Sequence, residues 1–575
     1  TGTLSAATYN TALGIGAMDA ITQGDYNVAV GYNSGTLITT GSHNTLLGGW
    51  AGGAISTGGQ NVLIGGEAGD ALGAGGYNVA VGFRALSSEN DHGKNVAIGK
   101  SALQNQDAGA DGYNIAIGYE AGVNVTTGIQ NTLIGGGTSL TTGSYNVAVG
   151  KGALDSEDAH GYNVAIGVNA LNAQDAGSTA YNVAVGFSAG LSVTTGTQNT
   201  LIGGLAGDAL TTGYRNAVLG YNALSAETTG AASVAIGYHA LRFQNTESYN
   251  YNIAIGAEAG QAITTGDNNT IVGGLAGDAL TTGGRNVAIG LGALGTEDTT
   301  GKAVAIGYGA LGTQNAGSDS YNVAVGYEAG NDITTGTYNT LIGGQAGDAL
   351  TTGARNVAIG FNALTTEDGN GYTVAVGYEA LKTQNAGAEV YNVAVGYQAG
   401  LAITTGSSNT IIGGLAGDAL TAGGNSVAIG TQALSAEDDH SFNVAVGARA
   451  LETLNAGAHG YNTAVGYVAG TAMTTGVQNT IIGGQAGDAL TTGSYNTAVG
   501  YLALSTEDAH GYNTAIGREA LKTLIAGADA GNVAVGMQAG AEMTTGRYNN
   551  ILGTYAGDAL TTGWSNVAIG YLALS

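Results

Sequence analysis

The chain repeats one short phrase along its whole length. An Asn, then three residues drawn mostly from Val, Ala, Ile, Leu and Thr, then a Gly recur about 33 times in 575 residues, with a period of about 17 residues. Early copies begin at Asn27, Asn44 and Asn61, and the last begins at Asn566. Self-similarity at a short fixed period is typical of a solenoid, in which each unit contacts only its neighbours. The sequence therefore predicts a rod.

The copy that begins at Asn356 indicates how one coil is built. Val357 and Ile359 alternate with Ala358, and this period of two predicts a short strand with Val357 and Ile359 on its buried face. Residues 363–366 predict a second short strand with another inward apolar residue, and residues 367–371 have the composition of a turn. We therefore expect an all-β fold, a narrow parallel β-roll.

The composition agrees with stacked strands. The chain has no Pro, which would remove a backbone donor from the ladder, and 105 Gly residues, which suit corners and close backbone approaches. With about 4.8 Å between parallel strands, about 33 coils of 17–19 residues give a rod of about 155 Å.

Four types of coil alternate to form a 70-residue super-repeat. Three coils of about 17 residues and one of about 19 residues make up the unit, which is clearest from residue 182 to 575. We find no linker or change in composition, so we expect residues 1–575 to form a single continuous solenoid. The leading Asn residues are expected to form a structural ladder, because Asn tolerates the left-handed corner conformation and stacked amides bond to one another. In successive super-repeats they are Asn182, Asn252, Asn322, Asn392, Asn462 and Asn532.

Charge and residue usage exclude several classes of function. A net charge of −27 disfavours nucleic acid and anionic membranes as partners, and no stretch is apolar enough to insert in a bilayer. No Cys is present for disulfides, thiolate zinc sites or thiol catalysis. We expect no catalytic residues and no cofactor, because an active site needs unique residues in a pocket and this chain repeats everything. The chain opens on Thr1, which suggests a piece of something longer or a processed product.

Two motifs are similar to those of known fibrous families. The phrase at residues 425–430, Asn-Ser-Val-Ala-Ile-Gly, resembles the head repeats of trimeric autotransporter adhesins, which are left-handed parallel β-rolls of three chains. Residues 11–14 and 513–521 resemble repeats of phage tail fibres and related virion fibres. The resemblance implies a left-handed, homotrimeric rod at the virion surface or outside the cell. No heptad run is present for an adhesin stalk, which favours the virion fibre.

Three functions remain open from the sequence. The first is the shaft of a phage tail fibre or similar appendage used in host attachment, where it would contact a host surface glycan or protein. The second is a self-assembling extracellular filament subunit or a bacterial trimeric surface adhesin, because both ends stop within a repeat. The third is an ice- or mineral-binding solenoid that uses its Thr-Thr-Gly rows, which only half of the coils carry. We expect a homo-oligomer, because few charges cover the solvent side of each coil.

An Asp recurs in most super-repeats, within Ala-Gly-Asp-Ala-Leu. The stretch is similar to calcium-binding nonapeptide repeats, but the Asp residues of neighbouring super-repeats lie four coils apart, about 19 Å, which is too far to share an ion. We interpret them as solvated turn residues. They are Asp70, Asp208, Asp278, Asp348, Asp418, Asp488 and Asp558.

A second acidic turn combines Glu and Asp with His in some super-repeats. Glu, Asp and His could hold a divalent ion, but Thr299 and Thr300 replace part of the set in another super-repeat. We therefore expect solubilising surface charge and no metal site, with loose Ca²⁺ collection across three chains as the alternative. The His-containing turns are Glu157-Asp158 with His160, Glu437-Asp438-Asp439 with His440, and Glu507-Asp508 with His510.

Tyr is the dominant aromatic residue, with 30 copies against 5 Phe and 2 Trp. Stacking between coils or between chains is the simpler interpretation of its rows. Exposed rows could instead dock sugars, since flat amphipathic rings suit glycan faces. The candidate glycan contacts are Tyr327, Tyr397 and Tyr467.

Overall fold

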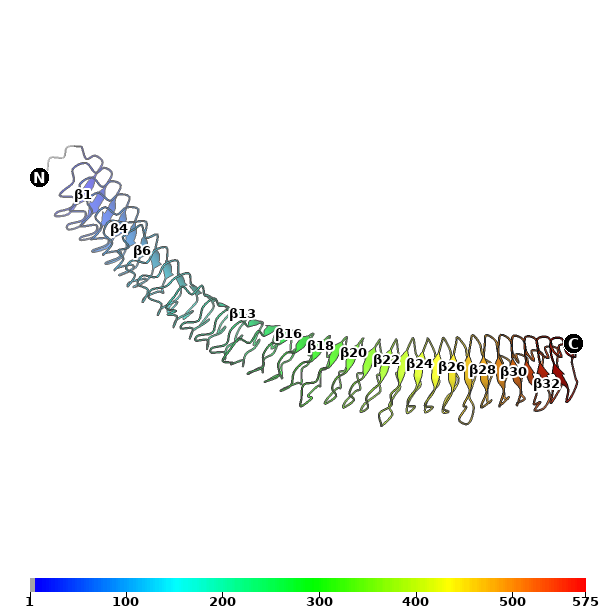
Figure 1. The fold of residues 1–575 in the computed structure, drawn as a ribbon. Helices are drawn as coiled ribbons and strands as arrows, with labels where there is room; N and C mark the ends of the chain where they lie inside the picture. The colour runs from blue at the N-terminus through cyan, green and yellow to red at the C-terminus, as the bar shows by residue number, and fades with distance from the viewer. Residues whose placement is uncertain (1–5) are drawn as a thin grey trace. The chain divides into compact units, whose positions relative to one another are not determined.

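The computed structural model describes residues 6–575, which form two units, one up to residue 285 and one from residue 286. Within residues 6–575 the chain is all-β, contains no helix and winds as a parallel β-solenoid of about 33 turns. Figure 1 shows the coils of each unit following one another in chain order. The predicted fold class, an all-β parallel solenoid, is confirmed.

Each coil contributes one strand of three residues. The strands of the first unit are β1 (Thr11–Leu13), β2 (Val28–Val30), β3 (Thr45–Leu47), β4 (Val62–Ile64), β5 (Val79–Val81), β6 (Val96–Ile98), β7 (Ile115–Ile117), β8 (Thr132–Ile134), β9 (Val147–Val149), β10 (Val164–Ile166), β11 (Val183–Val185), β12 (Thr200–Ile202), β13 (Ala217–Leu219), β14 (Val234–Ile236), β15 (Ile253–Ile255) and β16 (Thr270–Val272). The strands of the second unit are β17 (Val287–Ile289), β18 (Val304–Ile306), β19 (Val323–Val325), β20 (Thr340–Ile342), β21 (Val357–Ile359), β22 (Val374–Val376), β23 (Val393–Val395), β24 (Thr410–Ile412), β25 (Val427–Ile429), β26 (Val444–Val446), β27 (Thr463–Val465), β28 (Thr480–Ile482), β29 (Thr497–Val499), β30 (Thr514–Ile516), β31 (Val533–Val535), β32 (Asn550–Leu552) and β33 (Val567–Ile569).

Within each unit a strand pairs in parallel with the strand of the next coil, and the register follows the repeat. In the first unit Val183 of β11 pairs with Thr200 of β12, which lies one short coil later. In the second unit Val374 of β22 pairs with Val393 of β23, across the longer coil that the sequence predicts. The repeat length read from the sequence therefore sets the register of the sheet: each strand residue pairs with the residue one repeat later.

The strand side chains point the opposite way from the prediction made from the sequence. In β21 the central Ala358 is completely buried, whereas Val357 and Ile359 are only half-buried on the outer face. Every strand except β1 has this arrangement, with its middle residue inside. The prediction that Val357 and Ile359 point inward is wrong, because the interior of so narrow a coil has room for one strand side chain. A row of β-branched side chains is left on the outside.

The predicted second strand is a turn. Ala363 and Leu364 are completely buried, as expected of inward apolar residues, but Leu364 has a φ of 55°, which no extended strand allows. Its N–H still donates to the carbonyl of Ala380 in the next coil, at 3.0 Å. Each coil is thus closed by one strand and by irregular backbone that bonds from coil to coil.

The Gly that ends most strands is required by the neighbouring coil. Gly413, after β24, has a φ of 138°, and a Cβ at this position would overlap the carbonyl of Gly430 in the next coil. The adjacent Gly414 faces open space, so it is not required in the same way. Part of the high Gly content therefore comes from one close backbone approach in most coils.

Candidate functional site

The Asn residues that begin the coils lie inside the solenoid and join one coil to the next. Asn392 is completely buried, its Oδ1 accepts the backbone N–H of Asn409 at 2.9 Å, and its Nδ2 donates to the carbonyl of Gly406 at 2.7 Å. The predicted ladder positions are all completely buried and make the same two bonds: Asn182, Asn252, Asn322, Asn392, Asn462 and Asn532. Amides used in this way are unavailable to an external ligand.

The left-handed corner is one residue earlier than we expected. Tyr391 has a φ of 52° and Tyr321 a φ of 51°, whereas Asn392 and Asn322 do not have positive φ. The left-handed region costs an L-residue roughly 1–2 kcal/mol. The following Asn supplies ladder bonds beside this strained corner, and this explains why a bulky residue is tolerated there.

The acidic turns are not simple surface charge, because their Glu is the most buried residue of the turn. The next residue, such as Asp158, remains exposed. The expectation of solvated charge is therefore wrong for the Glu and right for Asp158. The completely buried residues are Glu89, Glu157, Glu227, Glu297, Glu367, Glu437 and Glu507.

The buried Glu closes its own turn. In five of the seven turns its Oε1 accepts the backbone N–H of the residue three positions later, at 2.9 Å for Glu157 and His160 and at 2.7 Å for Glu227 and Gly230. Oε1 of Glu89 and of Glu437 has no such hydrogen bond. A carboxylate can be buried only if such donors replace water. This local bond explains why the chain places a Glu here whatever residue follows it.

A buried Gln in the next coil completes the environment of the carboxylate in the middle super-repeats. Gln384 donates its Nε2 to Glu367 Oε2 and to Thr373 Oγ1, both at 3.0 Å. Its Oε1 accepts from Nδ2 of Asn392 at 2.9 Å. The turn is thereby connected to the Asn ladder through one amide side chain.

The Gln position and the ladder residue of its own coil differ between super-repeats in a linked way in several coils, although Asn163 occurs together with Gln174. With Ser233 or Thr373 in the ladder, a Gln serves the buried Glu, as described for Gln384. Where the ladder residue is Asn443, the Gln position holds Leu454, and Asn443 itself donates to the carboxylate of Glu437 at 3.3 Å. The coil therefore has two alternative ways of supplying one donor.

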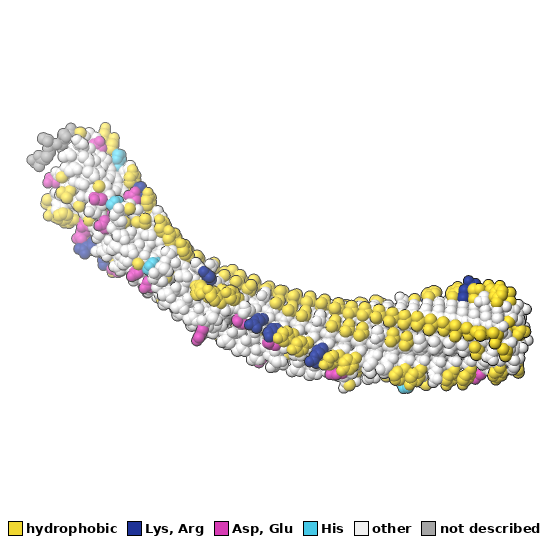
Figure 2. All heavy atoms as spheres, viewed as in Figure 1, with side chains coloured by type: hydrophobic (Ala, Val, Ile, Leu, Met, Phe, Trp, Pro, Cys, Tyr) yellow, Lys and Arg dark blue, Asp and Glu magenta, His cyan; other side chains and the backbone are white. Residues whose placement is uncertain are grey.

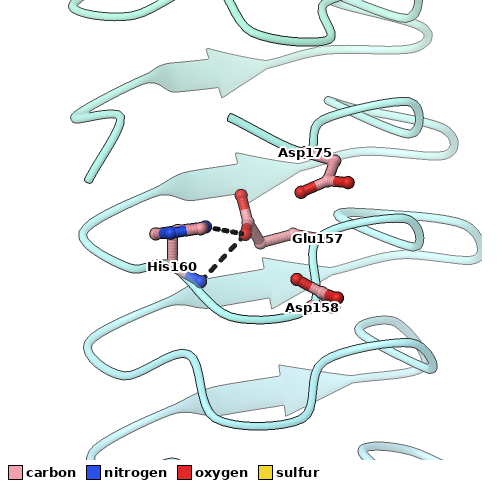
Figure 3. Close-up of side chains that lie close together, drawn as sticks. All are labelled: Glu157, Asp158, His160 and Asp175. Carbon is pink, nitrogen blue, oxygen red and sulfur yellow. Dashed lines mark hydrogen bonds and ion pairs between the residues drawn. The ribbon is translucent and has the colours of Figure 1, made fainter. Parts of the chain in front are cut away.

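Four of these turns place a His against the buried Glu. Nδ1 of His160 lies 3.4 Å from Oε1 of Glu157, and the carboxylates of Asp158 and of Asp175 in the following coil lie beside them (Figure 3). One ligand atom from each of these four residues can be chosen so that all lie within 4.8 Å of one another. Burial raises the pKa of Glu157 above its ordinary value, although the nearby His160 opposes this shift.

Two further turns also contain Glu, Asp and His, and in a third turn the His lies farther from the Glu. The corresponding Nδ1–Oε1 distances are 3.3 Å for His440 and Glu437 and 3.1 Å for His510 and Glu507. His92 lies farther from Glu89, at 3.9 Å. Burial, together with the charge of Asp107, raises the pKa of Glu89 to about 7.

The Asp of Ala-Gly-Asp-Ala-Leu is half-buried rather than fully solvated. Burial and the nearby Asp332 raise the pKa of Asp348 to about 6, and its Oδ1 is shielded from solvent without a hydrogen-bond partner among residues 6–575. Burial likewise raises the pKa of Asp208 and Asp418. The interpretation as a solvated turn residue holds only for part of each side chain.

The Tyr rows stack from coil to coil, as the simpler interpretation predicts. The rings of Tyr308 and Tyr327 lie 5.3 Å apart and within 9° of parallel, and those of Tyr378 and Tyr397 lie 5.4 Å apart. Tyr327 and Tyr397 remain 55% exposed and Tyr467 is 61% exposed. The outer faces of these rings are thus open to a partner, and the glycan contact stays a prediction.

Sequence reasoning missed the buried Glu–Gln–Asn network, although the sequence contains a clue to it. The Glu of the turn recurs in every super-repeat from Glu89 onward, whereas the next residue changes among Asn, Asp and Thr. A surface charge would not need a fixed position.

No protein-family model matches this chain, and a comparison with curated proteins finds no match either. In the part of the chain from residue 6 onward, no helix has the length and hydrophobicity that a bilayer crossing requires.

Proposed function

We propose that the chain is a structural fibre segment that assembles side by side with copies of itself, as a left-handed homotrimer, in the shaft of a phage tail fibre or a similar virion appendage used in host attachment. The resemblance of its repeats to fibre proteins and the regular coils within each unit support this proposal. A repeated surface would contact a host glycan or protein weakly at many points, and multivalency would add these contacts together.

The observation that carries the proposal is the outward row of β-branched side chains on the strands. Rows of hydrophobic side chains run along the surface of each unit in Figure 2. Apolar surface that continues from coil to coil marks an interaction site rather than ordinary exposure. Ile residues at the third strand position that are 37–40% exposed include Ile98, Ile134, Ile166, Ile342, Ile412, Ile482 and Ile516.

A second copy of the chain suits this row better than a globular partner does. The row repeats with every coil, and only a partner with the same spacing can cover it coil by coil. A closed ring of identical chains satisfies this condition with one type of interface. Burying outward Val and Ile would contribute about 25 cal/mol per Å² of apolar area.

Light scattering of wild type and charged variants tests the proposal. Ile412→Lys combined with Ile482→Lys places two cations in the row, whereas Thr405→Lys adds one at an exposed turn. We expect wild type and Thr405→Lys to have three times the mass of one chain and the double variant to be monomeric. A wild-type monomer at every concentration, or a trimer that survives the double variant, would contradict lateral assembly through this row.

A further inference from the structure

Three turns gather nitrogen and oxygen ligands around a buried carboxylate, those of Glu157, Glu437 and Glu507, and the first two also leave polar atoms without partners within residues 6–575. The first consists of Glu157, Asp158 and His160 from one coil and Asp175 from the next, and Figure 3 shows the four side chains close together. The second consists of Glu437, Asp438 and His440, whose ligand atoms also lie within 4.8 Å of one another. Acidic groups on a surface often cluster without binding anything, so the clusters need a second observation.

That observation is a set of polar atoms left without partners inside the protein. Glu157 is completely buried, yet its Oε2 has no hydrogen-bond partner among the residues that the structure describes. Nδ1 of His160 has none either, and the same is true of Oε1 of Glu437 and Nδ1 of His440. A buried carboxylate oxygen without a donor is costly, by about 1–3 kcal/mol or more. The missing partner is a hydrogen-bond donor or a cation.

The spacing of these atoms fits a metal ion better than a hydrogen bond. The Nδ1–Oε1 distances are 3.4 Å at His160 and 3.3 Å at His440, beyond the usual 2.7–3.2 Å of an N–H···O bond. Ligands at about 2.0–2.2 Å from a tetrahedral ion lie about 3.4 Å from one another. The Glu–His pair is therefore already placed as one edge of such a site.

We propose that the Glu157 and Glu437 turns each bind a first-row divalent cation, with Zn²⁺ as its representative. An imidazole nitrogen together with carboxylate oxygens suits Zn²⁺, Mn²⁺ or Fe²⁺, whereas Ca²⁺ and Mg²⁺ take oxygen ligands throughout. The Glu and His supply the fixed ligands, and the neighbouring Asp side chains, which reach solvent, close around the ion. The site is independent of the fibre function and of any second chain.

The Glu227 and Glu507 turns satisfy their carboxylate without a cation, whereas both carboxylate oxygens of Glu89 lack a hydrogen-bond partner within residues 6–575 and its His92 lies farther away, at 3.9 Å. Nδ1 of His510 forms a hydrogen bond of 3.1 Å with Glu507 Oε1, and Glu507 Oε2 accepts the N–H of Ala526 at 3.2 Å. Glu227 accepts backbone donors and the side chain of Gln244. These turns show that the fold alone does not create the unpartnered atoms, and they supply matched controls.

The Glu157 site would fasten two consecutive coils, because Asp175 comes from the coil after that of Glu157. The corresponding residue beside Glu437 is Asn455, a neutral and weaker ligand. We therefore expect the first site to bind more tightly than the second. Bound metal would protect residues 155–176 from local opening.

Calorimetric titration of chelator-treated protein with Zn²⁺ tests the proposal. We expect two saturable sites per chain, one remaining in His160→Gln, none in His160→Gln/His440→Gln, and two in His510→Gln. Asp175→Asn should weaken the tighter site by at least about tenfold. Hydrogen exchange of each metal-free variant should match wild type, which separates a lost ligand from a lost fold.

Three results would overturn the proposal. They are the absence of saturable Zn²⁺ binding, two sites persisting in the double His variant, and an equal loss of binding in His510→Gln. The first would mean that a proton, and not a metal ion, is shared between Glu157 and His160. With Co²⁺ in place of Zn²⁺, an octahedral visible spectrum in wild type would contradict the tetrahedral site, and a tetrahedral one lost in His160→Gln would support it.

Discussion

Replacing Gln384 by Leu tests whether the Gln and the ladder residue compensate for one another. Glu367 is completely buried, and Gln384 is the side-chain donor to its Oε2, at 3.0 Å. Losing that donor should cost about 2–3 kcal/mol, because a charged acceptor is left unpaired. The apolar Leu side chain returns about 1 kcal/mol. The net expectation for Gln384→Leu is a loss of about 1–2 kcal/mol in local stability.

Adding Thr373→Asn should restore most of this loss. The double variant recreates the arrangement at Glu437, where Asn443 donates to the carboxylate and Leu454 occupies the Gln position. Thr373→Asn alone should instead be destabilising by about 1–2 kcal/mol. It would recreate the Asn163 and Gln174 pair, in which both amide nitrogens lack partners within residues 6–575. The expected coupling energy is about −2 kcal/mol.

Native-state hydrogen exchange measured by mass spectrometry is the suitable assay, because global unfolding of a repeat protein is not two-state. Peptides covering residues 364–410 report the free energy of local opening, and peptides covering residues 146–166 serve as the unaffected reference. Additive effects of the two substitutions, within about 0.5 kcal/mol, would refute the compensation argument. So would a double variant that opens as readily as Gln384→Leu.

Two further predictions concern the pH response and the Gly positions. Glu89 has a pKa of about 7 in the folded chain against 4.5 for a free side chain, so the local stability of wild type relative to Glu89→Gln should be highest below pH 4.5 and fall by up to about 3 kcal/mol as the pH rises through 7. A difference in local opening energy that stays flat from pH 4 to 8, measured by native-state hydrogen exchange around residue 89, would contradict the burial of a titrating carboxyl. Gly413→Ala should cost at least about 3 kcal/mol in local opening energy, whereas Gly414→Ala should cost less than about 1 kcal/mol. The reason is that only Gly413 has a positive φ and lies against the backbone of the next coil. Equal effects of the two substitutions would contradict this close backbone approach.

The solenoid and its register could be predicted from the repeat, but the facing of the strands could not be taken from alternation alone. A three-residue strand can bury its two outer residues or its central one, and both choices are consistent with an alternating pattern. The sequence does contain the answer: the first position is often polar, as in Thr340 and Thr410, whereas the central position always holds Ala, Val, Leu or Ile. Polarity at the first position is therefore a better indicator of the exposed face than the larger size of the flanking Val and Ile.

The second strand was predicted wrongly because apolar spacing does not report backbone dihedral angles. Leu364 is buried as expected but sits in the left-handed region, where a Leu has no intrinsic preference. Its backbone is held there by bonds to the next coil, so the conformation comes from stacking and not from local propensity. A single copy of the repeat would not reveal it.

The acidic turn shows why one repeated residue can serve several kinds of chemistry. In five of the seven turns the Glu accepts the backbone N–H three residues later, and this bond forms with different side chains at that position, such as those of His160, Gly230 and Asn370. The backbone bond therefore fixes the carboxylate, while the variable side chain decides what faces it. With His160 it faces an imidazole nitrogen that has no hydrogen-bond partner within residues 6–575, and with Gly230 or Asn370 it is satisfied by hydrogen bonds. A metal site could thus be gained or lost by one substitution without disturbing the solenoid, because the substituted side chain is not part of what holds the coils together.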